Sequence, residues 1–314
     1  MSEYKTVTGE KNSSSVLITG GNGFIGRKLT SSLLEGGYKV SYLSRSAARQ
    51  GLVRVFNWNP DKGLIDTNSL DGIDFIVHLA GANIGEKRWS EKRKQEIIRS
   101  RVDSAKFLHR KISERDINLK AFISASATGI YGTTTSEKIF NENDPPANDY
   151  LADVCRQWEE AADLFKNSGI RTVKIRTAVV LDNSDGALTK LLKPANFGFL
   201  VQTGNGKQHM PWIHIRDLCN IYQKAIEDPG MTGSYNATAP QSVTHAEFMK
   251  VLGRVLRKPV FPVPVPGIAL KMILGEMANI ILKGSNVSSE KIVKTGYQFI
   301  YGNLEQALRN VLNE

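Results

Sequence analysis

One segment near the N-terminus restricts the fold more than any other part of the chain. Residues 16–19 form an apolar run, and glycines follow it at positions 20, 23 and 26. In nucleotide-binding α/β folds, such glycines permit a tight turn, close approach of the backbone to a pyrophosphate, and close packing of a helix on the sheet. The free N–H groups at the start of that helix bind phosphate. The predicted cofactor contacts in this loop are Gly20, Asn22, Gly23, Phe24, Ile25 and Gly26.

The first 180 residues alternate apolar strand patterns with helical patterns. The expected strands are residues 15–19, 38–43, 53–57, 73–79, 119–126 and 170–180, and the expected helices are 24–35, 90–114 and 150–167. Continuous apolar strands between helices are typical of a parallel sheet that is covered on both faces. A plain glycine-rich turn would not explain why the loop opens this series. We therefore predict an α/β fold with a Rossmann-type, doubly wound parallel sheet.

The alternation loosens after residue 180, and a smaller, mostly helical C-terminal part follows. Residues 181–212 are rich in Gly and Asn and are expected to form loops, whereas four prolines within 259–266 favour an extended connector. Further helices are expected at 216–227, 245–256, 267–283 and 304–312. The predicted organisation is a flexible tail (1–14), an NADP-binding Rossmann domain (15–180) and a substrate-side part (181–314), of which residues 210–240 pack back on the Rossmann core.

The end of the second predicted strand favours NADP(H) over NAD(H). NAD-binding proteins of this fold place an Asp or Glu about 20 residues after the loop, where it binds the ribose 2′-hydroxyl. This chain has no acidic residue between Glu35 and Asp61. Arg45 can instead pair with a 2′-phosphate, and Ser44 can donate a hydrogen bond to it. The alternative for Arg45 is simple exposure at a strand end, so the missing acid is the stronger part of the inference.

Small residues follow the fourth predicted strand. His78 is succeeded by Leu79, Ala80 and Gly81, and small side chains at this edge let a cofactor lie close to the backbone. Leu79, Ala80 and Gly81 therefore join the predicted cofactor contacts. We interpret His78 itself as a packed residue rather than a catalyst.

The overall composition limits the classes of partner. Two cysteines, Cys155 and Cys219, cannot form a disulfide framework, and the five histidines show no metal-ligand spacing. The most apolar stretch, residues 267–282, is too short to span a membrane and contains two charged side chains. These features predict a cytoplasmic protein without a metal, whose partner is a small molecule rather than a membrane.

The net charge of +10 would also suit a nucleic-acid partner. The basic side chains are scattered, however, and the densest run, residues 86–101, alternates Lys and Arg with Glu. That pattern is typical of a solvated helix face. Nucleic-acid binding is therefore not the leading hypothesis, and the sequence leaves the oligomeric state open.

Further motifs extend from the glycine loop to the C-terminus. They are residues 124–126 with Tyr131-Gly132, the pairs Arg88-Trp89, Ser100-Arg101 and Trp158-Glu159, and residues 204–208, 212–218, 235–240 and 275–278. With these motifs the chain resembles the extended short-chain dehydrogenase/reductase superfamily. Within it, the chain resembles most the atypical subgroup labelled NAD-dependent epimerase/dehydratase. The resemblance implies a Rossmann fold, a nicotinamide dinucleotide and a substrate crevice at the carboxyl ends of the strands.

The resemblance breaks in the catalytic machinery. Extended members of the superfamily use a Tyr-x-x-x-Lys pair on the helix after the fifth strand, where the lysine lowers the pKa of the tyrosine. Four residues after Tyr150 stands Val154, and the other register gives Leu151 and Cys155. Members of the atypical subgroup generally lack the pair as well. A positioned general acid contributes about 10²–10⁴-fold to a rate, so turnover is less well supported than cofactor binding.

Two hydroxyl groups are the remaining catalytic candidates. Ser126 falls where the superfamily keeps its oxygen-binding hydroxyl, with Ser124 as the alternative if the register shifts, and Tyr150 is the candidate proton carrier. Tyr150 is equally well explained as an aromatic residue at a helix N-terminus. Cys155 is more readily explained as a packed core residue than as a nucleophile.

Four residues are the candidates for the substrate pocket: Trp89, Arg176, Gln208 and Trp212. Core packing is the alternative for both tryptophans, although flat apolar side chains also suit a pocket wall. The sequence predicts an NADP(H)-dependent oxidoreductase or epimerase that acts on a small polar metabolite. The alternative is an NADP(H)-binding regulatory protein without turnover.

Overall fold

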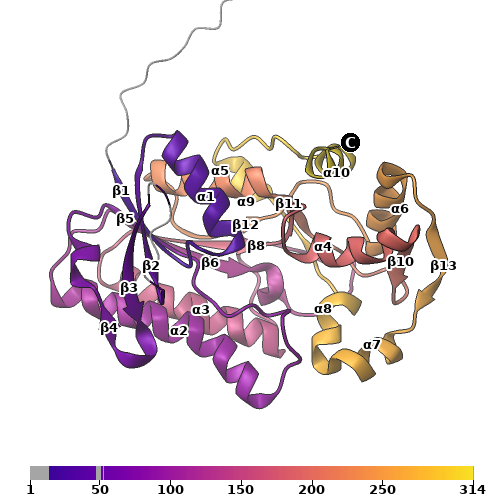
Figure 1. Cartoon of the computed structure of the whole chain (residues 1–314), viewed down its shortest axis with the longest axis horizontal. Helices are drawn as coiled ribbons and strands as arrows, with labels where there is room; N and C mark the ends of the chain where they lie inside the picture. The colour runs from indigo at the N-terminus through magenta and orange to yellow at the C-terminus, as the bar shows by residue number, and fades with distance from the viewer. Residues whose placement is uncertain (1–13, 47–50, 52, 314) are drawn as a thin grey trace, which may run out of the picture.

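A sheet of eight strands forms the centre of the computed structural model, which describes residues 14–46, 51 and 53–313 (Figure 1). In spatial order the strands are β12 (Gly233–Ala237), β8 (Thr172–Thr177), β6 (Ala121–Ala127), β5 (Phe75–His78), β1 (Ser15–Thr19), β2 (Lys39–Ser44), β3 (Arg54–Asn59) and β4 (Leu64–Ile65). Neighbouring strands are parallel except β3 and β4. The predicted fold class is confirmed. The predicted tail lies outside the described residues except for Ser14.

The order of the strands places three strand ends together. β1 lies between β5 and β2, and Thr19 at its end is aligned with Leu43 on one side and His78 on the other. The chain therefore winds outward in both directions from β1. In open α/β sheets such a switch point is where ligands bind.

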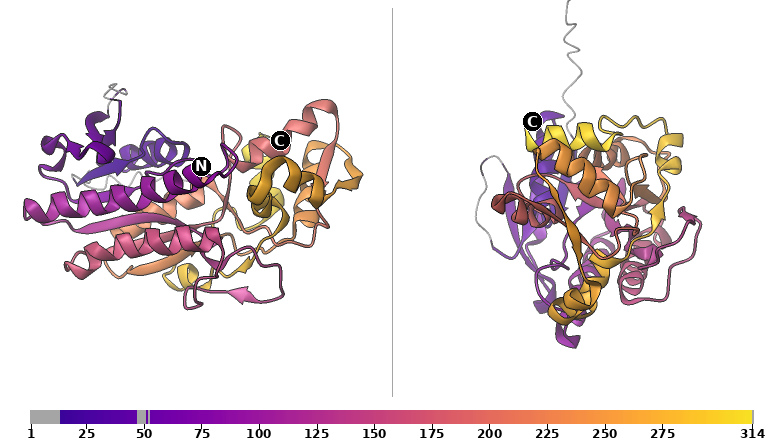
Figure 2. Two further views of the ribbon diagram at one scale, coloured as in Figure 1. Left: turned by 90° about the horizontal axis from the view of Figure 1, so that it is seen from below. Right: turned by 90° about the vertical axis from the view of Figure 1, so that its right-hand side faces the viewer.

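Two pairs of helices cover the sheet: α1 (Phe24–Glu35) and α5 (Ile215–Glu227) on one face, and α2 (Glu91–Glu114) and α3 (Tyr150–Asn167) on the other (Figures 1 and 2). Alternate side chains of β1 pack on opposite faces of the sheet. Val16 and Ile18 belong to one apolar cluster, whereas Leu17 belongs to the other. Burial on both faces explains the continuously apolar strand sequences.

The helices differ in how they begin. Ser90 accepts the backbone N–H of Arg93 at the start of α2, and Asp149 accepts that of Ala152 at the start of α3. Such a cap stabilises a helix by about 1 kcal/mol. By contrast, α1 begins after Gly23 without a side-chain cap. Its first N–H groups therefore remain available to a ligand.

The C-terminal part continues the molecule at one end of the sheet (Figure 1). Its elements are β9 (Val179–Leu181), α4 (Ala187–Leu192), β10 (Leu200–Thr203), β11 (Trp212–His214), α6 (His245–Leu256), β13 (Val260–Val265), α7 (Gly267–Leu274), α8 (Asn279–Leu282), β14 (Asn286–Val287), α9 (Glu290–Lys294) and α10 (Leu304–Leu312). A separate apolar cluster joins Trp212 to side chains of α6 and α10. Residues 233–237 do not pack in this part; they form β12, which pairs with β8 in the central sheet.

Two stretches differ from the sequence expectation. Residues 181–212, which were expected to be loops, contain α4, β10 and the first residue of β11. The helix expected over residues 267–283 is divided, because Gly275 adopts a φ of +62° at the end of α7. Residues 260–265 are extended and pair in parallel with β10, consistent with the proline-rich sequence.

Candidate functional site

The loop between β1 and α1 is shaped by its glycines. Gly20 has a φ of +68°, and a Cβ atom there would lie 2.9 Å from the carbonyl carbon of Leu79. A Cβ atom at Gly26 would lie 2.6 Å from the carbonyl oxygen of Gly20, which also accepts the N–H of Gly23 at 2.9 Å. The conflicting atoms belong to the backbone and cannot rotate away. The three glycines therefore hold the loop in a shape that larger residues would disrupt.

The start of α1 suits a phosphate group. No side chain caps the helix, and its first turn contains no acidic residue. Phe24 and Ile25 are half-buried and pack against the apolar cluster under α1, which fixes the position of this turn. Free N–H groups and the positive end of the helix dipole together attract anions.

A hydrogen bond joins this loop to the end of β2. Asn22 Nδ2 donates to Ser44 Oγ at 3.1 Å, and Asn22 Oδ1 is buried with no partner among the described residues. Arg45, which follows Ser44, is exposed and thus accessible to a ligand. The hydrogen bond and charge of Arg93 hold the pKa of Glu96 below its usual value, with a smaller contribution from Arg45. Glu96 is itself paired with Arg93 at 2.8 Å.

The end of β5 forms the third part of this edge. Leu79 donates its N–H to the carbonyl oxygen of Thr19 at 3.1 Å, and Ala80 donates its N–H to the Thr19 hydroxyl at 3.2 Å. Gly81 is exposed, and a Cβ atom there would lie 2.9 Å from Arg101 Cζ. The cofactor contacts predicted from three separate segments thus lie at the ends of three adjacent strands.

His78 is a buried residue that joins β1, β5 and α2. Its Nδ1 lies 2.8 Å from the Thr19 hydroxyl, and its Nε2 lies 3.1 Å from the Ser104 hydroxyl. Burial lowers the pKa of His78 to about 4, so the ring is neutral near pH 7. This geometry agrees with the interpretation of His78 as a packed residue.

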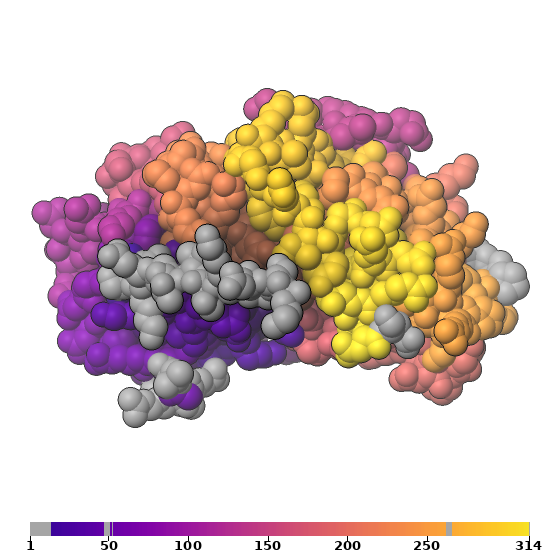
Figure 3. All heavy atoms as spheres, turned by 90° about the horizontal axis from the view of Figure 1, so that it is seen from above, coloured from indigo at the N-terminus to yellow at the C-terminus, as the bar shows by residue number. Residues whose placement is uncertain are grey.

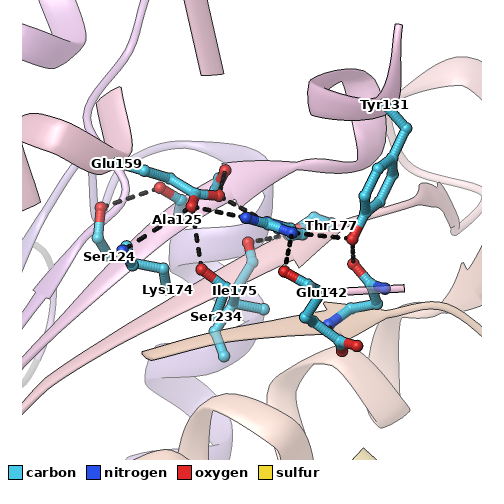
Figure 4. A network of polar contacts seen from close by, with 12 residues as sticks. Ser124, Ala125, Tyr131, Glu142, Glu159, Lys174, Ile175, Thr177 and Ser234 are labelled. Carbon is cyan, nitrogen blue, oxygen red and sulfur yellow. Dashed lines mark hydrogen bonds and ion pairs between the residues drawn. The ribbon is translucent and has the colours of Figure 1, made fainter. Parts of the chain in front are cut away.

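A buried polar network between the sheet and α3 is centred on Glu159 (Figure 4). Ser126 and Arg176 both belong to it. Glu159 accepts hydrogen bonds from Ser126 Oγ at 2.7 Å, from Arg176 Nε at 2.8 Å and from Arg176 Nη2 at 3.0 Å. Ser234 Oγ donates to the same carboxylate at 2.9 Å, and Lys174 Nζ lies 3.9 Å from it. The hydroxyl of Ser126 and the guanidinium of Arg176 are therefore occupied by protein partners.

The charges of this network stabilise one another. Burial alone would raise the pKa of Glu159, but Arg176, Ser126 and Lys174 outweigh burial and hold it below its usual value. Burial likewise opposes the charge of Arg176, but Glu159 raises the pKa of Arg176 above its usual value. Arg176 Nη1 also donates to Tyr131 Oη at 2.9 Å. Sequence reasoning missed the role of Glu159, because its partners lie on separate strands.

Tyr150 and Trp89 meet at a different place, between the starts of α2 and α3. Their rings pack edge to face with centroids 4.8 Å apart. Tyr150 Oη donates to the carbonyl oxygen of Lys94 at 3.1 Å, and Trp89 Nε1 donates to that of Ile84 at 2.9 Å. Burial raises the pKa of Tyr150 to about 12, although the charge of Arg101 opposes the change. Each of the two catalytic candidates, Tyr150 and Ser126, is thus bonded to its own set of protein partners.

A polar hollow of about 420 Å³ lies beside Tyr150 and is lined by Asp149, Asp153 and Arg156 among others. A second hollow of about 640 Å³ lies between α6 and β13 and is lined by basic residues, including Lys250. Only the first contains a residue predicted for the site.

Gln208 and Trp212 lie inside the C-terminal part. Trp212 is fully buried in the cluster under α6 and α10, and its Nε1 donates to the carbonyl oxygen of Gln241 at 3.0 Å. Gln208 Nε2 donates to the carbonyl oxygens of Thr203 and Ile281 at 3.1 and 3.0 Å. Gln208 Oε1 is buried without a partner among the described residues. This geometry matches the core-packing alternative for Trp212.

In one of the two registers considered for the Tyr and Lys positions, these are Leu151 and Cys155, and both lie beside Gly129, just after β6. A Cβ atom at Gly129 would lie 3.6 Å from Cys155 Sγ and 3.7 Å from Leu151 Cβ. Burial raises the pKa of Cys155 to about 12, so its thiol stays protonated near pH 7. A protonated, buried thiol is a poor nucleophile.

The motif at residues 212–218 has a structural role that the sequence did not reveal. Asp217 is fully buried and accepts the N–H groups of Ile300 and Tyr301 at 2.8 and 2.9 Å. The ring of His214 stacks on that of Tyr301 with centroids 3.9 Å apart. The motif thereby anchors the C-terminal segment, which occupies the middle of one face in Figure 3.

Two kinds of site are missing from the part of the chain that the structure describes. No three His, Cys, Asp or Glu side chains there are grouped to hold a metal ion. No helix there is long and apolar enough to cross a membrane.

The sheet order, the glycine loop and the strand ends around it define a Rossmann-type nucleotide-binding protein of the short-chain dehydrogenase/reductase class. The model of the NAD dependent epimerase/dehydratase family matches residues 16–237, and a domain of unknown function, DUF1731, matches residues 265–311. The chain belongs to the NAD dependent epimerase/dehydratase family, as its motifs predicted.

The similarity to known relatives extends over nearly the whole chain. The epimerase family protein YfhF of Bacillus subtilis is 36% identical over 300 residues, which cover 95% of this chain and 97% of that protein. The epimerase family protein SDR39U1 of Mus musculus is 34% identical and covers 95% of this chain and 99% of its own length. A crystal structure of human epimerase family protein SDR39U1 with NADPH matches with a TM-score of 0.84 at 31% identity, covering 96% of this chain and 99% of that chain.

Proposed function

We propose that this protein is an NADP(H)-dependent oxidoreductase or epimerase that acts on a small polar metabolite. The observation that carries the choice of cofactor is the end of β2, where Arg45 is exposed beside Ser44, and Ser44 is bonded to Asn22 of the phosphate loop. A guanidinium and a hydroxyl at this place suit a 2′-phosphate, whereas an acid would repel it. The human relative whose structure contains NADPH supports the same choice.

The proposed cofactor position follows the three strand ends. The pyrophosphate would lie over Gly20 to Gly26 at the start of α1, and the 2′-phosphate beside Arg45. The backbone of residues 79–81 would lie along the nicotinamide half. This path brings the reactive end toward α2 and α3, where Tyr150, Trp89 and the polar hollow are found. Among the sequence candidates, these two residues have the surroundings that best suit a substrate pocket.

Nucleotide binding is the first test, because NADPH and NADH are fluorescent. We expect the wild-type protein to bind NADPH more tightly than NADH. The Arg45→Glu variant should bind NADPH about 10- to 100-fold more weakly, because a charge-assisted interaction is replaced by repulsion. Its affinity for NADH should change little.

The matched control is Lys39→Glu, which reverses an exposed charge at the opposite end of the same strand. This variant should keep the NADPH affinity of the wild type. If the wild type prefers NADH, or if both variants weaken NADPH equally, the proposed role of Arg45 is wrong.

A regulatory protein without turnover is the second candidate, and the absence of a Tyr-x-x-x-Lys pair from α3 in either register favours it. The NADPH complex should therefore be incubated with aldehydes, ketones and nucleotide sugars while the absorbance of NADPH is followed. Oxidation that falls in Tyr150→Phe supports catalysis at that residue. Oxidation unchanged by both Tyr150→Phe and Ser126→Ala would reject the two candidates, and no oxidation across the panel would favour the regulator.

A further inference from the structure

Arg101 is a positioned cation at the candidate site that neither the phosphate loop nor the network in Figure 4 uses. It lies on α2, and its Nη1 donates to the carbonyl oxygens of Ala82 at 3.1 Å and Ile97 at 3.0 Å. Its guanidinium lies against Gly81, where a Cβ atom would be 2.9 Å from Cζ. The ring of Trp158 lies 4.9 Å from Cζ. The helix, the end of β5 and the indole therefore hold the guanidinium in one place.

Arg101 lacks the acidic partner that another arginine of the same helix has. Arg93 pairs with Glu86 at 3.2 Å and with Glu96 at 2.8 Å. Within residues 14–46, 51 and 53–313, no carboxylate pairs with Arg101, and its Nε and Nη2 have no acceptor. Arg101 is half-buried, and a charge that is partly removed from water gains from an opposite charge or from further hydrogen bonds. An anion from outside the chain would provide both.

The surroundings place such an anion beside the cofactor. Gly81, which contacts the guanidinium, is among the proposed cofactor contacts. Burial lowers the pKa of Arg101 below its usual value, and its neighbours on α3, Tyr150 and Cys155, are protonated and neutral near pH 7. Trp158 Nε1 is buried without a partner among the described residues, so a second unused donor exists in the same region. A ligand here would lie between the nicotinamide end of the site and α3, where a substrate is expected.

We propose that Arg101 forms an anion-binding subsite that receives a carboxylate or phosphate group of the substrate. Nε and Nη2 lie on one edge of the guanidinium and match the two oxygens of such a group. The proposal deepens the proposed function and rests on it, because it defines the substrate relative to the cofactor edge at Gly81. The proposal narrows the proposed substrate class from small polar metabolites to anionic ones.

The test uses the full chain saturated with NADPH and two simple probes, oxalate and inorganic phosphate. Calorimetric titration at an ionic strength held constant with potassium chloride should show saturable binding of at least one probe. In Arg101→Gln the affinity should fall about 10- to 100-fold, because a charge-assisted hydrogen-bond pair is lost. Arg101→Lys should retain part of the affinity, because it keeps the charge without the planar pair of donors.

The matched control is Arg99→Gln, which removes the same charge from an exposed position of α2 and should bind the probe like the wild type. Circular dichroism and thermal unfolding verify that Arg101→Gln is folded. If it is not folded, the probe affinity of Arg101→Lys is compared with that of the wild type instead. Equal probe binding in Arg101→Gln and wild type, or no saturable binding in the wild type, would overturn the subsite.

The outcome separates this proposal from the proposed function. If Arg101→Gln loses NADPH to the same degree as the probe, the anion is a phosphate of the cofactor, and the substrate assignment is wrong. If the wild type fails to bind NADPH, the proposed function fails, and the titration is repeated on the nucleotide-free chain. Saturable probe binding that depends on Arg101 there would retain the anion site and reject only its link to NADPH.

Discussion

At the residue scale, Glu159 is expected to have a large effect on stability. Replacing it with Gln would leave Arg176 charged and buried beside a neutral partner. Breaking a buried pair in this way costs about 3–5 kcal/mol in the free energy of unfolding. We expect urea unfolding of Glu159→Gln to show a loss of this size.

The neighbouring residue provides the control for that measurement. Glu160 pairs with Arg156 on the exposed side of α3. Exposed pairs contribute about 0–1 kcal/mol, so Glu160→Gln should unfold nearly like the wild type. Equal losses in the two variants would contradict the central role of Glu159.

His78 predicts a pH dependence of stability. Its pKa is about 4 in the folded protein, and the ordinary value of about 6.5 applies to the unfolded chain. Because the pKa is depressed by folding, its contribution is complete above pH 6.5 and is lost as the pH falls toward 4. The loss between pH 6.5 and 5 should be roughly 2 kcal/mol. The free energy of unfolding, measured in urea at several pH values, should vary less with pH in His78→Gln than in the wild type.

Sequence reasoning reached furthest where residues close together in the chain form one motif. The glycine loop and Arg45 are local signals, because a strand, a turn and a helix follow one another along the chain. Ser126 and Arg176 were chosen by residue type and place, but their common partner Glu159 comes from another element. The spacing of these residues in the sequence does not predict that β6, α3 and β8 bring them into contact.

At the element scale, the junction of β1 and α1 depends on Gly26. A Cβ atom there would lie 2.6 Å from the carbonyl oxygen of Gly20 and 2.7 Å from Gly21 Cα. Gly26→Ala must therefore move the loop away from the helix, and overpacking of this kind costs about 1–3 kcal/mol. We expect at least tenfold weaker NADPH binding by fluorescence titration and a lower melting temperature.

Gly36 at the other end of α1 is the comparison, because its nearest contacts to an added Cβ atom are at 3.4 Å. Gly36→Ala should keep NADPH affinity. A wild-type affinity in Gly26→Ala would contradict the close packing described for the loop.

Element boundaries could be predicted best where apolar periodicity is strong. The helices α1, α3, α6 and α10 begin and end at the predicted residues. The helix expected over residues 267–283 was too long, because the apolar pattern continues through the turn at Gly275. Residues 181–212 were assigned to loops on composition, whereas pairing with β9 and β13 gives part of them strand structure. That pairing is a tertiary effect which local sequence does not encode.

At the scale of the whole molecule, Asp217 on α5, a helix that covers the central sheet, anchors the C-terminal segment. Its carboxylate accepts two backbone N–H groups and the Tyr297 hydroxyl, all from the C-terminal segment. Asp217→Ala would leave both N–H groups without an acceptor, at a cost of roughly 2–5 kcal/mol. Hydrogen exchange should then be faster at Ile300 and Tyr301. Asp217→Asn keeps one acceptor and should lose less, and unchanged exchange in Asp217→Ala would contradict the anchoring role.

The candidate site could be predicted at the cofactor end and less so at the substrate end. The proposed nucleotide contacts come from strand ends, and the position of strand ends follows from the order of a parallel sheet. The substrate end depends on how the C-terminal part packs. In that part, Trp212 is a core residue rather than a pocket residue. The sequence indicated Arg101 only as part of a motif, whereas the structure shows its guanidinium without an acidic partner among the described residues.

The pairing of β12 with β8 has a consequence for biosynthesis. β8 ends at residue 177, but the strand that covers its outer edge is made only when residue 237 has been synthesised. During that interval the nascent chain presents an open edge of its main sheet, and such edges pair with other chains. A truncated product that ends near residue 180 would keep the edge open permanently. Molecular chaperones that bind unpaired strands should therefore associate with the nascent chain before its last third leaves the ribosome.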